Sequence, residues 1–177
     1  PEFKDAQEDA EDVIRISAIQ NFNGSDFSLV LPMSAFFKER LDKIKPDIVH
    51  SHHPFLIGST AVRVSNKYHV PLVYTQHTLF EEYTHYVPVG LTKMKQFVVS
   101  LSTGYANLSD HVIAPSESIA QLLKKRGVRV PLDIIPTGVH VDEFAREDGL
   151  KVRKNNNIGE DAFVLGHVGR LATEKNL

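Results

Sequence analysis

The sequence contains no cysteine, no long apolar run and almost no net charge. Without cysteine it can form no disulfide and offer no thiolate as nucleophile or metal ligand, which is compatible with the cytosol. Its apolar runs are far too short to span a bilayer, so any membrane contact is expected to be peripheral. A formal net charge of -2 gives no reason to expect nucleic acid as a partner. We therefore expect a cytoplasmic protein, with peripheral contact to the inner face of a membrane left open.

What remains is the composition of an ordinary globular protein. The 177 residues are 42% hydrophobic and 24% charged, enough for one full core or for one core plus a piece of another. Residues 1–12 differ from the rest, because they hold six acids against one lysine and no apolar stripe. We interpret them as an acidic leader, a solvated tail or loop.

From residue 13 onward, strand and helix patterns alternate along the chain. Helices are expected at 57–68, 91–108 and 117–126, and another opens at Pro32 and ends at Lys45-Pro46. Strands are expected at 14–18, 47–50, 71–75, 111–114, 132–135 and 162–168, with a loop at 137–144. Ser116 is a natural N-cap for the third helix, and Gly127 a natural stop. The alternation predicts an α/β fold with a parallel, doubly wound sheet.

The domain boundary is expected between about Glu143 and Asp161. Residues 13–144 hold several strand-helix units and are predicted to form one domain, followed by a linker at 145–160. Residues 161–177 hold one strand and the loop after it. A lone strand cannot bury both of its faces, so the chain is expected to be truncated inside a second domain.

The segment from Asp47 to Gly58 raises the question of a metal site. His50 and His52 are two residues apart and so lie on the same side of a strand, a spacing that zinc hydrolases also use. His77 and Glu82 could complete such a site, but no second compact ligand pair exists. Pro54 stands where an HxHxDH motif needs aspartate. We therefore expect no metal, and interpret the histidines as lining a polar cleft.

Two strand-end segments supply candidate ligand contacts. His52 and His53 follow one strand, and His50 is interpreted as a hydrogen-bonded structural residue. The second segment, from Pro71 to Pro88, is rich in histidine, glutamate and tyrosine, which can hydrogen-bond sugar hydroxyls or polarise an acceptor hydroxyl. Its candidate residues are His77, Thr78, Glu82, Tyr83 and Tyr86. The alternative for this segment is a solvated surface loop.

The last residues carry a third pattern. The strand at 162–168 leads into Gly169 and Arg170, with Lys175 five residues beyond the arginine. Backbone amides, a helix N-terminus and two cations could together hold a pyrophosphate.

Two basic clusters have plainer explanations. Lys93 and Lys95 lie beside the apolar residues of the 91–108 helix and could help the protein settle on an anionic membrane. We favour a core helix with solvated lysines. The cluster Lys124, Lys125, Arg126 and Arg129 is explained by the negative pole of the helix that it ends.

Five segments in order resemble the retaining glycosyltransferases of the GT-B fold, family 4, and most of all the branch that transfers glucose to diacylglycerol. They are KPDIVHSHHPFLIG, PLVYTQHTLFEEYTHYVP, VIAPSESIAQLLKKRGV, IIPTGVHVDEF and GHVGRLATEKNL. The resemblance implies two Rossmann-like domains facing each other across a cleft. Residues 13–144 would be the acceptor-side domain, whose first strand is missing, and 161–177 the start of the nucleotide-sugar-binding domain.

The resemblance also implies substrates. It points to a nucleotide-sugar donor, UDP-glucose, a lipid or sugar acceptor, retention of configuration and no cofactor. The acidic motif of two glutamates that binds the donor is absent from the sequence. The polypeptide by itself is therefore expected to be inactive.

Roles for individual residues follow from the same resemblance. His77 would be the catalytic residue beside the transferred sugar, and Gly169, Arg170 and Lys175 would hold the donor diphosphate. Glu82, Tyr83 and Tyr86 would lie toward the acceptor, while Ser116, Thr137 and Gly138 would line the cleft. Two alternatives stay open: a metal-dependent hydrolase with a His-x-His site, and a non-catalytic carbohydrate- or lipid-binding module.

Overall fold

The computed structural model describes residues 13–16, 18–19, 29–30, 41–86, 91–145 and 149–169. The chain divides into two compact units, Pro1–Pro136 and Thr137–Leu177, and each is described by itself. The predicted domain boundaries remain predictions.

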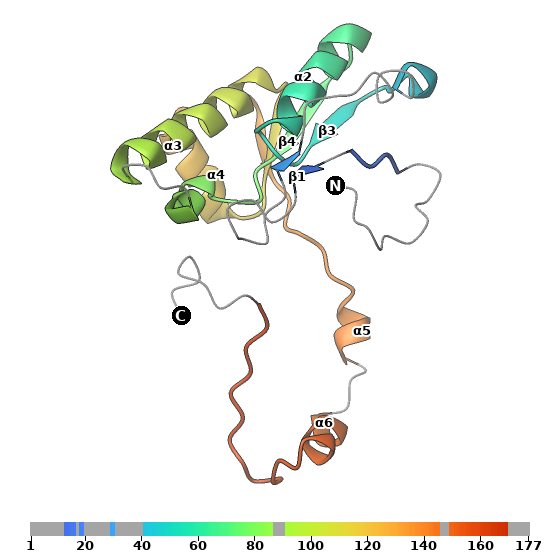
Figure 1. Ribbon diagram of the computed structural model, residues 1–177, viewed down its shortest axis with the longest axis vertical. Coiled ribbons are helices and arrows are strands. Elements are labelled where there is room, and N and C mark those ends of the chain that lie inside the picture. The colour runs from blue at the N-terminus through green and yellow to red at the C-terminus, as the bar shows by residue number, and fades with distance from the viewer. Residues whose placement is uncertain are drawn as a thin grey trace. The chain divides into compact units, whose positions relative to one another are not determined.

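The first unit is built on a parallel sheet (Figure 1). Its order is β3-β4-β5-β6, with strands β3 (Val49–Ser51), β4 (Leu72–Thr75), β5 (His111–Ala114) and β6 (Leu132–Ile134). In the register, Tyr74 of β4 lies opposite Ser51 of β3 and Val112 of β5. All three pairings are parallel, which confirms the predicted α/β class and is consistent with a Rossmann-like domain.

A helix connects each pair of neighbouring strands: α2 (Ile57–Tyr68), α3 (Leu91–Leu108) and α4 (Glu117–Lys125). The predicted bounds of α2 and α3 are confirmed to the residue. Ser116 caps α4 by accepting a hydrogen bond from the Ile119 N–H at 3.4 Å. Gly127 follows α4 at a φ of 97°, a left-handed conformation that glycine adopts readily. Residues 41–44 are helical and end before Lys45-Pro46, as predicted.

The core of this unit lies between the sheet and its helices. Alternate strand residues point to one face, where Tyr74 and Val112 pack against Tyr105 of α3 and Leu123 of α4. The Tyr105 hydroxyl donates to Ser51 Oγ at 2.7 Å, so α3 is also bonded to the end of β3. By the same alternation, His50 and Thr75 point to the opposite face of the sheet.

Two sequence predictions in this unit were inaccurate. Of the strand expected at 14–18, residues 14–16 form none, and Ala18 belongs to β1 (Ala18–Ile19), which pairs antiparallel with β2 (Leu29–Val30). On α3, which was predicted to be a core helix with solvated lysines, Phe97 and Leu101 are 58% and 45% exposed. The apolar stripe of α3 is wider than the side that packs, and small or hydroxyl-bearing residues such as Ser102 and Ala106 take the inner positions.

The second unit differs more from expectation. Helix α5 (Val141–Ala145) lies where a loop was predicted at 137–144, and α6 (Gly149–Asn155) lies within the predicted linker. Residues 162–168 form no strand, and Phe163 is 94% exposed. The predicted first strand of a second domain is therefore not formed. A strand needs a paired neighbour for its backbone groups, and no described residue of this unit forms one.

Candidate functional site

Histidines from two neighbouring strands meet at one edge of the sheet. Strand β3 runs into His52 and β4 runs into His77, and the carboxyl ends of adjacent parallel strands lie side by side. His52 Nδ1 lies 2.8 Å from His77 Nε2, and the ring centroids of His50 and His52 are 4.2 Å apart. His50 Nε2 lies 2.7 Å from Thr75 Oγ1. We call His50, His52 and His77 the histidine cluster. It contains both members of the predicted same-side pair.

The surroundings favour the neutral forms of two rings. Burial lowers the pKa of His52, and the like charge that His50 and His77 can carry lowers it further. Burial also lowers the pKa of His53, which a hydrogen bond to the Phe55 carbonyl partly opposes. A neutral imidazole has one donor and one acceptor nitrogen, so both rings can exchange hydrogen bonds with hydroxyl groups.

The geometry of the cluster does not suit a metal ion. The ranges that the structure describes include no group of three or more His, Asp or Glu side chains that could hold one. In these ranges His50 Nε2 contacts Thr75 Oγ1, and His52 Nδ1 contacts His77 Nε2.

The chain around His77 is fixed by its neighbour Gln76. The Gln76 side chain is buried, accepts from the Tyr74 hydroxyl at 2.6 Å through Oε1, and donates from Nε2 to the Thr78 carbonyl. The segment from Tyr74 to Thr78 is thereby bonded on both sides of His77. Because Gln76 points into the core, His77 points away from it and meets His52.

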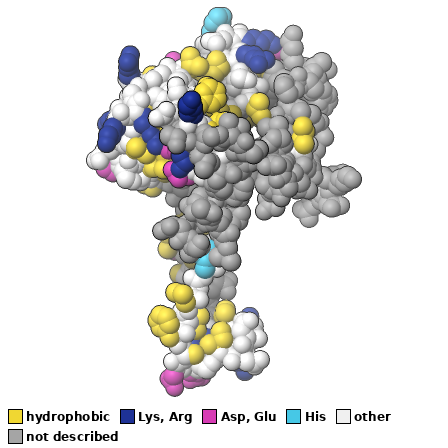
Figure 2. All heavy atoms as spheres, turned by 60° about the vertical axis from the view of Figure 1, so that its left-hand side comes forward, with side chains coloured by type: hydrophobic (Ala, Val, Ile, Leu, Met, Phe, Trp, Pro, Cys, Tyr) yellow, Lys and Arg dark blue, Asp and Glu magenta, His cyan; other side chains and the backbone are white. Residues whose placement is uncertain are grey.

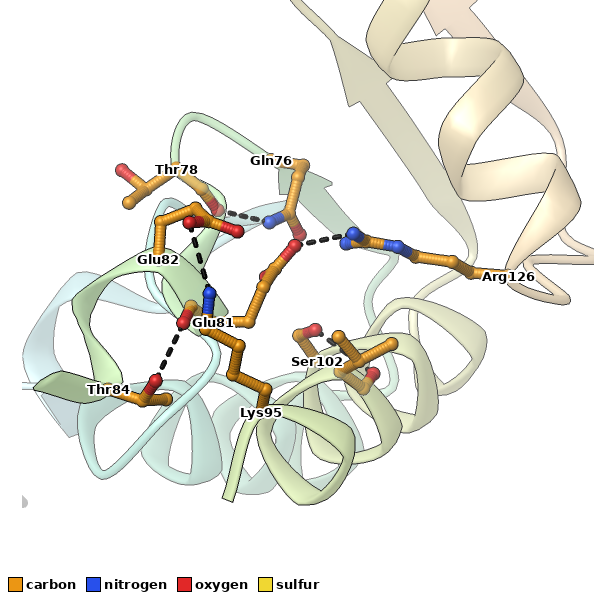
Figure 3. Close-up of polar contacts among 9 residues, drawn as sticks. Gln76, Thr78, Glu81, Glu82, Thr84, Lys95, Ser102 and Arg126 are labelled. Carbon is orange, nitrogen blue, oxygen red and sulfur yellow. Dashed lines mark hydrogen bonds and ion pairs between the residues drawn. The ribbon is translucent and has the colours of Figure 1, made fainter. Parts of the chain in front are cut away.

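Beyond Thr78 the chain forms the 3₁₀ helix η2 (Phe80–Tyr86) in place of the predicted loop. Figure 3 shows two glutamates of η2 reaching different cations: Glu82 pairs with Lys95 at 3.2 Å, and Glu81 pairs with Arg126. Glu81 is buried, whereas Glu82 is exposed. Sequence reasoning missed the roles of Gln76, Glu81 and Arg126. No local pattern distinguishes Glu81 from Glu82, since burial alone separates them.

The other predicted site residues are placed less completely. Ser116 lies just beyond β5, near the same edge of the sheet, and its hydroxyl caps α4. Tyr83 is half-buried within η2, and Tyr86 ends it. Thr137, Gly138 and Gly169 belong to the second unit, and Gly169 has a φ of 146°. Arg170 and Lys175 lie outside the described residues. None of the predicted roles is tested by these positions.

Within the described parts of the chain, no helix combines the length and the apolar character needed to cross a bilayer.

A parallel Rossmann-like sheet with polar side chains at its carboxyl edge is an arrangement typical of α/β proteins that bind small molecules. Residues 1–143 match the family Glycosyltransferase Family 4, and the chain belongs to this family. This confirms the resemblance drawn from the five segments, and the family is one of transferases.

Individual relatives support the same branch. The chain is 28% identical to the alpha-monoglucosyldiacylglycerol synthase of Streptococcus pneumoniae, over 93% of the chain and 38% of the relative. It is 30% identical to the protein of the same name from Acholeplasma laidlawii, over 98% of the chain and 46% of the relative. A D-inositol 3-phosphate glycosyltransferase of Geodermatophilus obscurus is 30% identical over 71% of the chain and 28% of the relative. The chain thus spans less than half the length of each.

The lowered histidine pKa values predict a dependence of stability on pH. Between the ordinary histidine pKa of 6.5 and the lowered folded-state values, the unfolded chain binds more protons than the folded chain. The free energy of unfolding therefore has its highest value above that pH window, and it decreases as the pH falls through the window. Urea midpoints measured at about pH 7.5 and about pH 5.5 should show the loss.

Two variants test whether the histidine cluster causes this pH dependence. His52→Asn should flatten the pH dependence. His69→Asn is the control outside the cluster, because His69 ends α2 at a φ of 55°, where asparagine is well tolerated. An identical slope in His52→Asn and the unaltered chain would contradict the assignment.

Proposed function

We propose that this chain is the acceptor-side part of a glycosyltransferase that moves glucose from a nucleotide-sugar, UDP-glucose, to diacylglycerol or another hydroxyl acceptor with retention of configuration. The family match and the names of two relatives that cover over nine-tenths of the chain support the choice of reaction. The observation that carries it is the contact between His52 and His77 at the carboxyl edge of β3 and β4. It gathers hydrogen-bonding imidazole rings where a sheet of this kind binds its ligand.

In this proposal the protein works by positioning and charge. His77 contacts the transferred sugar, and His52, His53 and Thr78 lie around it. Glu82, Tyr83 and Tyr86 face the acceptor, while Ser116, Thr137 and Gly138 line the cleft. Gly169, Arg170 and Lys175 hold the diphosphate and stabilise the charge that grows on the leaving group. The proposal uses no cofactor and no metal ion.

We place the acceptor at a membrane surface. On α3, Lys93, Phe97 and Leu101 follow one another at four-residue spacing and so share one side of the helix. The two apolar side chains are exposed, and Figure 2 shows hydrophobic side chains beside lysine and arginine side chains on the face that it presents. An exposed apolar stripe flanked by cations suits peripheral contact with anionic lipid. It supports a lipid acceptor over a soluble one.

The test uses the complete protein encoded by the reading frame that contains this sequence. Incubated with UDP-glucose and diacylglycerol vesicles, it should form glucosyldiacylglycerol. His77→Ala should lower the rate by roughly tenfold or more, the value of a hydrogen bond to substrate that strengthens as charge develops.

The control is Gln121→Ala, an exposed position on α4 whose side chain bonds to Glu117 of the same helix. It should leave the rate unchanged. Absence of a glucosyl product, or equal rates in His77→Ala and Gln121→Ala, would refute the proposal.

A further inference from the structure

Glu81 and Glu82 are adjacent in the sequence but have different surroundings. The Glu81 side chain is 6% exposed, while the Glu82 side chain is 52% exposed and pairs with Lys95, whose side chain is 45% exposed. Taking a carboxylate out of water costs several kcal/mol unless it is paired. The burial of Glu81 therefore needs an explanation that Glu82 does not.

The partner of Glu81 comes from another helix. Arg126 caps the C-terminal end of α4, and one of its guanidinium nitrogens donates to Glu81 Oε1 (Figure 3). The second carboxylate oxygen, Oε2, has no hydrogen-bond partner among the described residues. The buried charge of Glu81 is thus balanced by Arg126, which is itself largely covered, with 18% of its side chain exposed.

This pairing distinguishes the environment of Arg126 from that of the two lysines before it in the sequence. Lys124 and Lys125 are exposed, and the helix dipole accounts for them. The dipole explanation required only a cation near the helix end. It did not require that one of the three side chains turn inward to meet a glutamate 45 residues away in the sequence.

The pair also fixes the segment that follows His77. Glu81 lies in the first turn of η2, and its carbonyl accepts from Thr84 Oγ1 at 2.8 Å, so its side chain and backbone are both engaged. Glu82 and Tyr83 come next in the chain. Without Arg126, the buried carboxylate must either take up a proton or reach water, and reaching water moves η2.

We propose that Arg126 is a positioning residue for the acceptor side of the site, acting by holding Glu81 and, through it, the 3₁₀ helix that carries Glu82 and Tyr83. The acceptor role of these two residues rests on the proposed function. The tether from α4 to η2 does not depend on it. In this proposal Arg126 acts through Glu81 and not by contact with donor or acceptor.

Hydrogen exchange of this chain tests the tether without any substrate. In Arg126→Met, amides of a peptide covering 79–86 should exchange roughly tenfold faster or more, because the tether to α4 is lost and the unpaired buried charge also favours opening of the segment. Glu81→Gln should change exchange much less, since its amide oxygen still accepts from Arg126. Lys125→Met is the matched control from the same helical turn, and it should leave exchange of 79–86 unchanged.

The double variant Glu81→Gln, Arg126→Met distinguishes an effect on the position of η2 from an effect on the stability of the fold. It leaves no buried charge, so the urea midpoint should return close to that of the unaltered chain, while 79–86 should still exchange fast because the tether is gone. Restored protection of 79–86 in this double variant would overturn the proposal, as would equal exchange in Arg126→Met and Lys125→Met. Because no donor, acceptor or turnover is involved, failure here is distinguishable from failure of the glucosyl-transfer assay.

Discussion

Replacing Tyr74 with alanine is expected to lower the free energy of unfolding by about 3–5 kcal/mol, the usual cost of removing a large buried aromatic side chain. Tyr74 is completely buried at the centre of the core cluster, and its ring meets that of Tyr105 edge-on at a centroid distance of 5.0 Å. Removing it leaves a cavity between β4 and α3. Urea unfolding followed by circular dichroism measures the change.

The variant Tyr74→Phe isolates the hydroxyl group. It keeps the ring but leaves Gln76 Oε1 without its donor, which should cost about 1–3 kcal/mol because Gln76 is itself buried. Burial raises the pKa of Tyr74, so the hydroxyl stays protonated and continues to donate. Since Gln76 also holds the Thr78 carbonyl, the segment around His77 should loosen in both variants. Equal stabilities of Tyr74→Phe and the unaltered chain would show that this bond contributes little.

The second large effect is expected at Gly58. A Cβ atom there would lie 2.4 Å from the His53 carbonyl oxygen and 2.9 Å from the Tyr105 ring. Neither neighbour can yield easily, because one is backbone and the other is a core side chain. Gly58→Ala should therefore cost about 3 kcal/mol, as overpacked core substitutions do. The same clash displaces the His52-His53 turn, so His52 should lose its contact with His77.

Gly104→Ala is the matched control for Gly58→Ala. Gly104 also lies in a helix, α3, but a Cβ there would meet no atom within 4 Å. Alanine should stabilise the chain at this position by about 0.5–1 kcal/mol, because it restricts the unfolded chain. Opposite signs for the two substitutions are the expected result. A stabilising or neutral Gly58→Ala would mean that the turn after β3 can relax around the added methyl group.

Helices and strands with strong local signals were predictable. Ser116 and Gly127 mark the ends of α4 through capping and a left-handed turn, and the apolar spacing along α2 and α3 predicted their bounds. Residues 162–168 show the opposite case. Their apolar run favours a strand locally, but a strand forms by pairing, and the described residues of the second unit provide no partner.

The candidate site likewise has features that the local sequence predicts and features that only the tertiary structure sets. The spacing of His50 and His52, and their place at a strand end, follow from the period of a strand. The contact of His52 with His77 could be expected from parallel neighbours, but its geometry required the register of β3 against β4. The inward turn of Glu81 had no local signal.

The sequence by itself determined the α/β alternation, the limits of α2 and α3, the capping of α4 and membership of Glycosyltransferase Family 4, because each depends on residues close together in the chain or on motif order. Tertiary structure decided which polar side chains are buried and paired with one another. Glu81 is held by Arg126, and Gln76 joins Tyr74 to Thr78, because burial makes an unpaired polar group costly and packing brings each partner within reach.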